Sequence, residues 1–299
     1  MATLAKAVCR GGIGLVAAVV ALLLALQHLS AASPEVERAE RAEAARAAHS
    51  TAAAQFERAR AVQAAIFERA LSDLQPASPS DQDAHFYFVG FAGYGPEAVF
   101  KREVVAVRRL FNERFATEGR SVALINHTTT LEEFPIASAE NLERVLRRVG
   151  QIMAPDRDTL FLFLTSHGER ALLAVEMPGL HLAHLTPAML KGMLDRSGIK
   201  RRVVVVSACH SGSFLPALAS PNTLVIAAAR ADRTSFGCAD KREWTYFGDA
   251  FFNQALRQDT SFRKAFARAK RLVEQWEAKE KLLPSLPQIK GGEALVLTE

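Results

Sequence analysis

A histidine and a cysteine each follow one of the most hydrophobic runs of the chain. His167 comes directly after the run 160–166, and Cys209 comes directly after the run 203–208. If these runs form neighbouring strands of one sheet, a strand spacing of about 4.8 Å brings the imidazole within reach of the thiol. Such a pair can act as a nucleophile and its general base, because the imidazole accepts the thiol proton and the thiolate attacks.

Gly168 directly follows the histidine and adds a second catalytic element. Because glycine has no Cβ, its backbone N–H can approach a substrate carbonyl closely. Together with the N–H of Cys209, the N–H of Gly168 is expected to form an oxyanion hole. Packing is the simpler alternative, since a lone cysteine after a buried strand is most often inert. From the residue types alone, catalysis and packing both stay open.

Short apolar runs alternate with amphipathic helical stretches after residue 83, which is the pattern of βαβ units. The last three runs are almost wholly hydrophobic, as expected for parallel strands covered on both faces. The pattern predicts a doubly wound α/β fold with a mainly parallel sheet and helices on both faces. Ligands of such sheets bind beyond the carboxyl ends of the strands. The predicted strands are 85–90, 122–126, 160–166, 203–208 and 224–229, and the predicted helices are 96–116, 139–153 and 187–196.

The composition excludes several classes of protein. Of the 299 residues, 49% are hydrophobic and 23% are charged, which excludes wholesale disorder and collagen-like repeats. The net charge of +5 does not indicate nucleic-acid binding, because Lys and Arg are interspersed with Glu and Asp along the helical stretches. His181 and His184 have no further ligand at a suitable spacing, so we expect neither a metal nor another cofactor.

The chain has three cysteines, which are too few for a disulfide scaffold. A bridge from Cys238 to Cys209 would abolish the nucleophile, so we expect a free or packed thiol at position 238. His210 follows the nucleophile directly. In an extended chain its side chain points to the opposite side, which favours a structural role.

Residues 1–32 have the three parts of a membrane-targeting segment. Lys6 and Arg10 flank an apolar run over 11–26, and small residues follow at 30–32. Because a membrane span takes about 20 apolar residues, both a signal anchor and a cleaved signal peptide stay open. The positive-inside rule sends the remaining chain across the inner (plasma) membrane to its periplasmic or extracytoplasmic side. If the signal is cleaved, the protein is secreted.

The composition of residues 33–82 predicts a helical stalk followed by a linker. Ser33 and Pro34 are typical of a helix N-terminus, and the following stretch is rich in Ala, Glu and Arg. Large apolar residues at helical spacing appear mainly in its second half, so we expect the stalk to dock at its distal end. Two prolines within 75–81 indicate a loop. The α/β domain is therefore predicted over 83–299.

Three motifs follow one another in this domain. They are His167-Gly168 after one strand, Ser207-Ala208-Cys209-His210-Ser211-Gly212-Ser213 at the end of another, and a stretch from Ser235-Phe236-Gly237-Cys238 to Thr245-Tyr246-Phe247-Gly248-Asp249. Over about residues 85–256, the chain resembles the legumain-like (asparaginyl endopeptidase) cysteine peptidases, which are related in fold to the caspases. The resemblance implies a caspase-like fold with Cys209 as nucleophile, His167 as general base and Gly168 in the oxyanion hole.

The resemblance also implies a pocket for P1, the substrate residue before the scissile bond. Where the family carries an acidic residue two positions before the nucleophile, this chain has Ser207. Asp249 matches an aspartate of the family's pocket, and Lys101 or Arg102 lies near the position of its arginine. The implied substrate-binding residues are Ser207, Thr234, Ser235, Asp249, Lys101 and Arg102.

The function implied by the resemblance is hydrolysis of protein or peptide substrates after Asn or Asp through an acyl-enzyme. Two alternatives stay open. A transpeptidase would use the same pair and release the acyl group to an amine instead of water. A catalytically silent scaffold would use the stalk to bind a partner at the membrane, although the intact Cys209, His167 and Gly168 argue against it.

The membrane-targeting interpretation predicts the outcome of cell fractionation. We expect the full chain to stay with membranes after carbonate extraction, because a spanning anchor is held by its apolar surface and not by charge. A variant that lacks residues 1–32 is the control, and we expect it in the soluble fraction. Recovery of a soluble mature chain that begins near Ser33 would contradict the anchor and support cleavage.

Overall fold

The computed structural model describes residues 61–77 and 83–295 and, before them, residues 36, 38, 39, 41, 43 and 57. The predicted membrane-targeting segment, residues 1–32, lies outside the described residues. In the described part of the chain, none of the helices combines the length and the apolar character that a membrane crossing requires.

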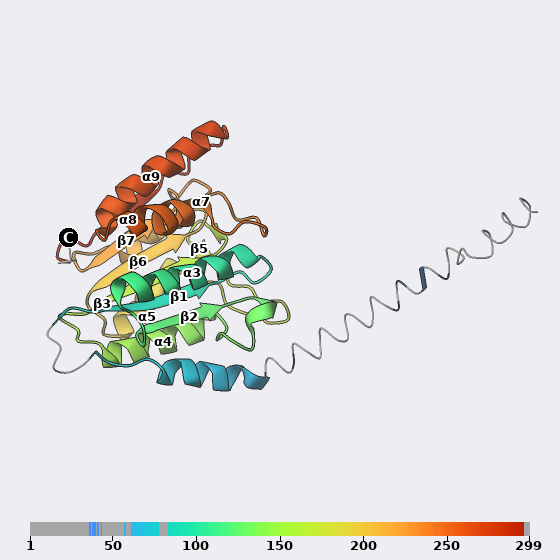
Figure 1. Ribbon diagram of the computed structural model, residues 1–299, viewed down its shortest axis with the longest axis horizontal. Coiled ribbons are helices and arrows are strands. Elements are labelled where there is room, and N and C mark those ends of the chain that lie inside the picture. The colour runs from blue at the N-terminus through green and yellow to red at the C-terminus, as the bar shows by residue number, and fades with distance from the viewer. Residues whose placement is uncertain are drawn as a thin grey trace, which may run out of the picture. The chain divides into compact units, whose positions relative to one another are not determined.

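A six-stranded sheet forms the centre of the domain, in the order β2-β1-β3-β6-β7-β8 (Figure 1). The strands from β2 to β7 in this order run parallel, and β8 pairs antiparallel with β7 at the edge. The predicted mainly parallel α/β sheet is confirmed. β8 was not predicted, because Ile289 is its only apolar residue. The strands are β1 (Phe86–Ala92), β2 (Ser121–Ile125), β3 (Thr159–Thr165), β6 (Arg202–Ser207), β7 (Thr223–Ala227) and β8 (Gln288–Lys290), and a separate pair is formed by β4 (Gly168–Glu169) and β5 (Leu172–Leu173).

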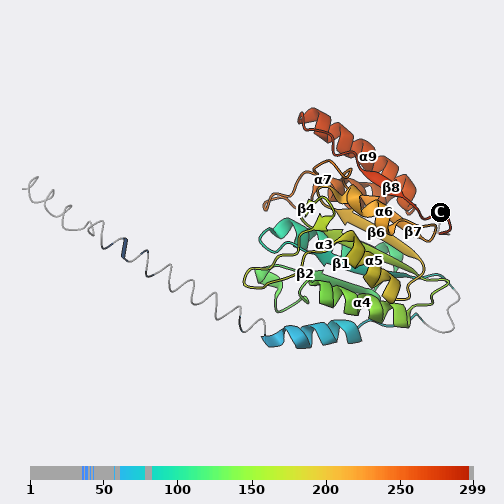
Figure 2. The same ribbon diagram turned by 180° about the vertical axis from the view of Figure 1, so that it is seen from behind.

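Helices cover both faces of the sheet, as predicted (Figures 1 and 2). One buried cluster joins the sheet to α4, α5 and α6, and a second joins it to α3 and to the helices from α7 to α9. Leu162 and Phe163 are neighbours on β3 and belong to different clusters, because successive strand residues point to opposite faces. The helices are α3 (Ala98–Phe115), α4 (Ala139–Ile152), α5 (Pro187–Arg196), α6 (Leu215–Leu218), α7 (Tyr246–Gly248), a π-helical segment (Asp249–Ala255), α8 (Leu256–Gln258) and α9 (Phe262–Lys279).

The N-terminus of α3 is held differently from that of α4. In front of α4, the Ser138 side chain accepts a hydrogen bond from the N–H of Asn141 at 3.1 Å, which is the usual N-cap bond. The N-cap residue of α3, Glu97, makes no such bond. Instead, Asp240 accepts a hydrogen bond from the N–H of Ala98 at 2.7 Å. The start of α3 is therefore tied to a loop that lies far away in the sequence.

The second half of the predicted stalk packs against the α/β domain. Residues 61–72 are helical, and Phe67 is 3% exposed within the cluster that contains α4 and α5. The amide of Gln63 donates to the carbonyl of Phe134 at 3.1 Å and accepts from the N–H of Ile136 at 2.9 Å. Burial of a phenylalanine side chain contributes about 1.5–3 kcal/mol, so this contact is a substantial part of the domain's stability.

The boundary of the domain consequently differs from the predicted one. The compact unit begins at Ala59, whereas the sequence analysis placed the boundary near residue 83. The two prolines of the loop 75–81 indicated a linker, but the helix before them folds back onto the domain. The large apolar residues in the second half of the stalk predict that it docks at its distal end, and the burial of Phe67 and Leu74 agrees with this. The pattern does not reveal that the docked helix is part of the compact unit, because a docked amphipathic helix has the same periodicity wherever it packs.

Candidate active site

The pairing of β3 with β6 brings the predicted catalytic residues to one edge of the sheet. Thr165, the last residue of β3, lies opposite Ser207, the last residue of β6. His167 and Cys209 each follow two residues later. A Cβ built on Gly168 would lie 2.5 Å from the carbonyl oxygen of Cys209. Only a glycine fits at this position without displacing the backbone next to the cysteine.

The imidazole of His167 is held by residues around the N-terminus of α3. Its Nε2 lies 3.0 Å from Oε2 of Glu97. The ring meets Tyr94 edge to face at a centroid distance of 4.6 Å and Phe100 at 5.2 Å. Because Nε2 faces the carboxylate, Nδ1 is the nitrogen left to accept a proton. A carboxylate in this position also stabilises the imidazolium that forms.

Glu97 was not among the residues predicted from the sequence. An acidic residue at the start of a helix is ordinary, because it interacts favourably with the helix dipole. Its contact with His167 joins residues that are 70 positions apart. The sequence carries no signal for this contact, since it depends on where α3 lies on the sheet.

The thiol of Cys209 is covered by the loop that follows β7. Its Sγ accepts a hydrogen bond from the N–H of Ser235 at 3.3 Å and lies 3.5 Å from the carbonyl oxygen of the same residue. The backbone of Ser235 therefore lies next to the sulfur atom, and a substrate that reaches this atom must contact the same loop.

His210 has partners in the same loop. Its N–H donates to the carbonyl of Arg233 at 2.8 Å, and its Nδ1 lies 3.1 Å from the carbonyl oxygen of Ala231. The backbone at His210 is left-handed, with φ of 56°, and not extended as the sequence analysis assumed. The side chain is directed to the loop by this backbone conformation.

Cys238 is a poor nucleophile. Burial raises the pKa of its thiol to about 12, and negative charge on Cys209, Glu103 and Glu97 adds to this increase. The thiol therefore stays protonated at neutral pH. Both Cys238 and Cys209 are free cysteines, as expected from the sequence.

The predicted pocket residues lie in different environments. Ser207 is 2% exposed, and its hydroxyl lies 3.3 Å from the hydroxyl of Thr245. Thr234 is exposed, next to Ser235. The carboxylate of Asp249 is half-buried and accepts hydrogen bonds from Asn253 at 2.8 Å and from Gln254 at 3.4 Å.

Neither Lys101 nor Arg102, the cations of the implied pocket, pairs with Asp249. The ammonium group of Lys101 contacts Thr129 Oγ1 at 2.6 Å and the ring of His127 at 3.0 Å. Arg102 donates to backbone carbonyls of the loop 240–242 and lies 3.5 Å from the carboxylate of Glu243. The rotation of α3 about its own axis decides these contacts, and the sequence does not specify it.

A second carboxylate near the site, that of Glu103, was also not predicted from the sequence. Glu103 of α3 is fully buried. Its Oε1 accepts hydrogen bonds from the N–H of Thr245 at 3.0 Å and from the Thr245 hydroxyl at 2.7 Å, and its Oε2 accepts one from the Thr165 hydroxyl at 2.7 Å. Burial raises the pKa of the Glu103 carboxyl above its usual range, against the effect of these hydrogen bonds.

The described residues contain no group of three or more His, Cys, Asp or Glu side chains arranged to hold a metal ion. Nδ1 of His184 instead accepts a hydrogen bond from the N–H of Val175 at 3.0 Å.

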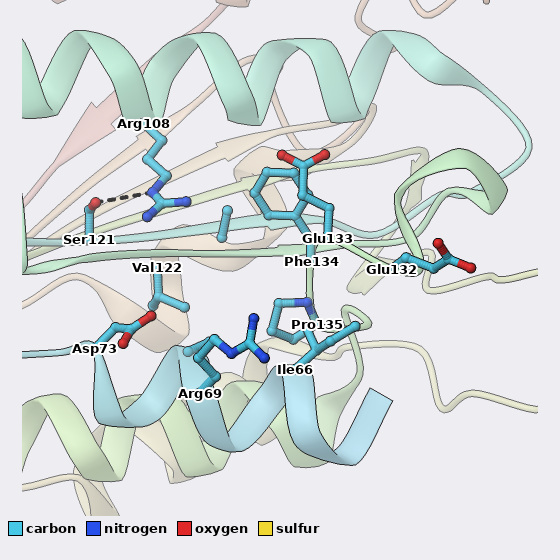
Figure 3. Close-up of a pocket in the computed structure, with 12 residues that line it drawn as sticks. Ile66, Arg69, Asp73, Arg108, Ser121, Val122, Glu132, Glu133, Phe134 and Pro135 are labelled. Atoms are coloured by element: carbon cyan, nitrogen blue, oxygen red, sulfur yellow. Dashed lines mark hydrogen bonds between the residues drawn. The ribbon is translucent and has the colours of Figure 1, made fainter. Parts of the chain in front are cut away.

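A pocket of about 190 Å³ lies between the helix 61–72, α3 and β2 (Figure 3). Arg69 and Arg108 extend into it from its two helical walls. Three carboxylates also line it, at Asp73, Glu132 and Glu133. None of the residues predicted to act in catalysis lines this pocket, and its mixed charges favour no single class of ligand.

The arrangement of the strands and helices is a caspase-like α/β fold. The structure is similar to the crystal structure of caspase-1 from Spodoptera frugiperda, with a TM-score of 0.50, 13% identity, and coverage of 72% of this chain and 93% of that one. This similarity concerns the fold alone.

The model of the Peptidase C13 family matches residues 139–295, and the chain belongs to this family of cysteine-type peptidases. It is also 30% identical to mouse legumain over 95 residues. This alignment covers 31% of the chain and spans only 22% of the length of legumain. Glu97 and Glu103 lie before the region that the family model matches.

The two thiols are expected to differ in reactivity. With a pKa of about 12, Cys238 has a thiolate fraction of about 10⁻⁴ at pH 8, and the thiolate is the reactive form. Iodoacetamide at pH 8 is expected to modify Cys209 and leave Cys238 largely intact, as measured by peptide mass spectrometry. The Cys209→Ala variant is the control. Faster labelling of Cys238 than of Cys209 would contradict this assignment.

Proposed function

We propose that the chain is a cysteine endopeptidase in which Cys209 is the nucleophile and His167 the general base. The observation that carries the proposal is the register of β3 and β6, which places the two residues at equivalent positions beyond paired strands. The close approach of Gly168 to the backbone of Cys209 supports an oxyanion hole at the same edge. Membership of the Peptidase C13 family supports the same chemistry.

The first half of the reaction follows from these positions. Nδ1 of His167 accepts the thiol proton, and the sulfur of Cys209 attacks the carbonyl carbon of the scissile bond. The carbonyl electron pair moves to oxygen, where the N–H groups of Gly168 and Cys209 stabilise the negative charge. When the intermediate collapses, the C–N bond breaks, and the imidazolium gives its proton to the leaving amine. Glu97 accepts a hydrogen bond from Nε2 throughout.

The second half releases the acyl group. Water attacks the thioester carbon and loses a proton to His167, and the thiolate leaves as the carboxylic acid forms. A transpeptidase would use an amine in place of this water. The products separate the two cases, because hydrolysis creates a new carboxylate and transpeptidation creates a new amide bond.

For P1 we propose a preference for Asn over Asp at neutral pH. Glu97 and Glu103 both act electrostatically on the thiol of Cys238, and Asp249 acts on Glu103. The carboxylate of Glu97, 3.0 Å from His167, and that of Asp249 are therefore the acidic groups that we expect a P1 side chain to meet. A charged aspartate in the substrate would be repelled by them, whereas a neutral amide would not.

We also propose that the peptidase works on the extracytoplasmic side of the membrane. The proposal rests on Lys6 and Arg10 before the apolar run 11–26, and the fractionation experiment described above tests it.

Removal of either member of the pair is expected to abolish hydrolysis. Cys209→Ala leaves no nucleophile, and His167→Ala is expected to lower kcat by about 10²–10⁴-fold, the usual contribution of a general base. Neither change should lower the melting temperature strongly, because both side chains are only partly buried. Release of a fluorescent group from peptide substrates measures activity, with Cys238→Ala as the matched control. Persistent activity in Cys209→Ala together with its loss in Cys238→Ala would refute the proposal.

The P1 preference is expected to depend on pH. As pH falls through the range near 4 in which carboxylic acids titrate, the repulsion of a substrate aspartate decreases. Cleavage after Asp should therefore rise relative to cleavage after Asn. The measurement is the Asn-to-Asp ratio of kcat/KM between pH 4 and 7.5, in wild type and in Asp249→Asn. The substrate aspartate titrates in both proteins, so only a shallower trend in the variant supports a contribution of Asp249, and equal trends would exclude it.

A further inference from the structure

Burial of the Glu103 carboxylate in the protein interior is energetically unfavourable. Among the described residues, this carboxylate forms no ion pair, and its three hydrogen-bond donors are two hydroxyls and one backbone N–H. A buried carboxylate without a cation is costly, and well-packed apolar side chains often replace buried charges without loss of stability. Packing alone therefore does not explain an acid at this position.

The bonds of Glu103 join the strand ends that carry the catalytic pair. Thr165 ends β3, two residues before His167, and Ser207 ends β6, two residues before Cys209. Glu103 binds Thr165 directly and reaches Ser207 through the hydroxyl of Thr245. One carboxylate thus holds Thr245 against the catalytic edge of the sheet.

Thr245 is in turn connected to the nucleophile through backbone contacts. The next residue, Tyr246, donates its N–H to the carbonyl of Phe236 at 3.0 Å. Phe236 follows Ser235, whose N–H donates to the sulfur of Cys209 at 3.3 Å. A continuous path of bonded groups therefore leads from Glu103 to the loop segment that covers the thiol.

Two glycines allow the close contacts along this path. A Cβ on Gly248 would overlap Oε1 of Glu103, so the first turn of α7 packs directly on the carboxylate. A Cβ on Gly237 would lie 2.7 Å from the backbone nitrogen of Tyr246, and its φ is +88°. The backbone of the loop is therefore in close contact with itself at Gly237 and Tyr246.

We propose that Glu103 is a positioning residue, which holds the loop segment 234–238 in the geometry that receives the substrate next to Cys209. It acts through Thr245 and touches neither reacting atom. The inference rests on the proposed peptidase function, and it concerns binding of the substrate and not the chemistry of the thiol.

The Glu103→Gln variant tests this proposal. Glutamine has nearly the same shape but only one acceptor oxygen, so it cannot accept hydrogen bonds at both ends of the group. We expect KM for a peptide substrate to rise at least about fivefold, the effect of losing one hydrogen bond. The rate of Cys209 alkylation by iodoacetamide should change less than about twofold, because the pair itself is intact. Glu113→Gln, an exposed site on α3, is the matched control.

The melting temperature of Glu103→Gln separates a positioning role of Glu103 from a purely structural one. Burial raises the pKa of Glu103, so the folded state favours the neutral form, and stability falls as pH rises through that raised pKa. Asp249 and Cys238 are the titratable neighbours that interact with this group. At neutral pH the uncharged glutamine should therefore leave the melting temperature unchanged or raise it, whereas a purely structural role predicts a lower melting temperature.

Hydrogen–deuterium exchange tests the position of the loop without any activity assay. In Glu103→Gln, peptides covering 234–246 are expected to exchange faster, and those of β3 and β6 are expected to stay unchanged. Unchanged exchange together with an unchanged KM would overturn the proposal. An inactive wild-type protein would instead contradict the proposed function, while faster exchange in the variant would still support the role of Glu103.

A second pair of variants covers the case in which Glu103→Gln fails to fold. Thr245→Ser keeps the hydroxyl that donates to Glu103, and Thr245→Val replaces it by a methyl group of similar size. We expect the serine variant to retain the wild-type KM and the valine variant to reproduce the rise in KM. Equal KM values in the two variants would overturn the proposal.

Discussion

The parallel pairing of β3 with β6 is the interaction on which the active site depends. It places Thr165 opposite Ser207, so the backbones that leave the two strands begin side by side. A shift of the register by one residue would reverse the direction of every later side chain on one strand, and His167 would no longer lie on the same side as Cys209. The apolar side chains on both faces of these strands fix the register, because each face packs against its own layer of helices.

The N-terminal half of α3 is the second constraint. Tyr94, Glu97 and Phe100 surround the imidazole of His167, while Arg102 and Glu103 hold the loop 240–245. The start of α3 and the residues just before it thus contact the imidazole of His167, and the next turn of the helix contacts the loop that lies beside Cys209. Because Asp240 also caps the first turn of α3, the helix and the loop stabilise each other.

The acidic character of the site follows from these contacts. The side chain of Glu97 is partly exposed next to His167, and Glu103 lies in the interior, where burial opposes its charge. The two cations expected near Asp249 are engaged elsewhere, with Thr129 for Lys101 and with the loop 240–243 for Arg102. The carboxylate of Asp249 is therefore not offset by either of these cations.

The sequence by itself determined most of the elements and was enough to propose Cys209 and His167 as the catalytic pair. Apolar runs bounded by turn residues predict strands. Because a histidine and a cysteine follow two such runs, the two residues are expected to lie close together once the strands pair. The contacts of Glu97 and Glu103 and the partners of Lys101 and Arg102 appeared only in the tertiary structure. The same holds for the particular contacts by which residues 61–74 dock on the domain. Periodicity reports which face of a helix is apolar, but the helix's position and rotation on the sheet depend on packing between residues that are distant in the chain.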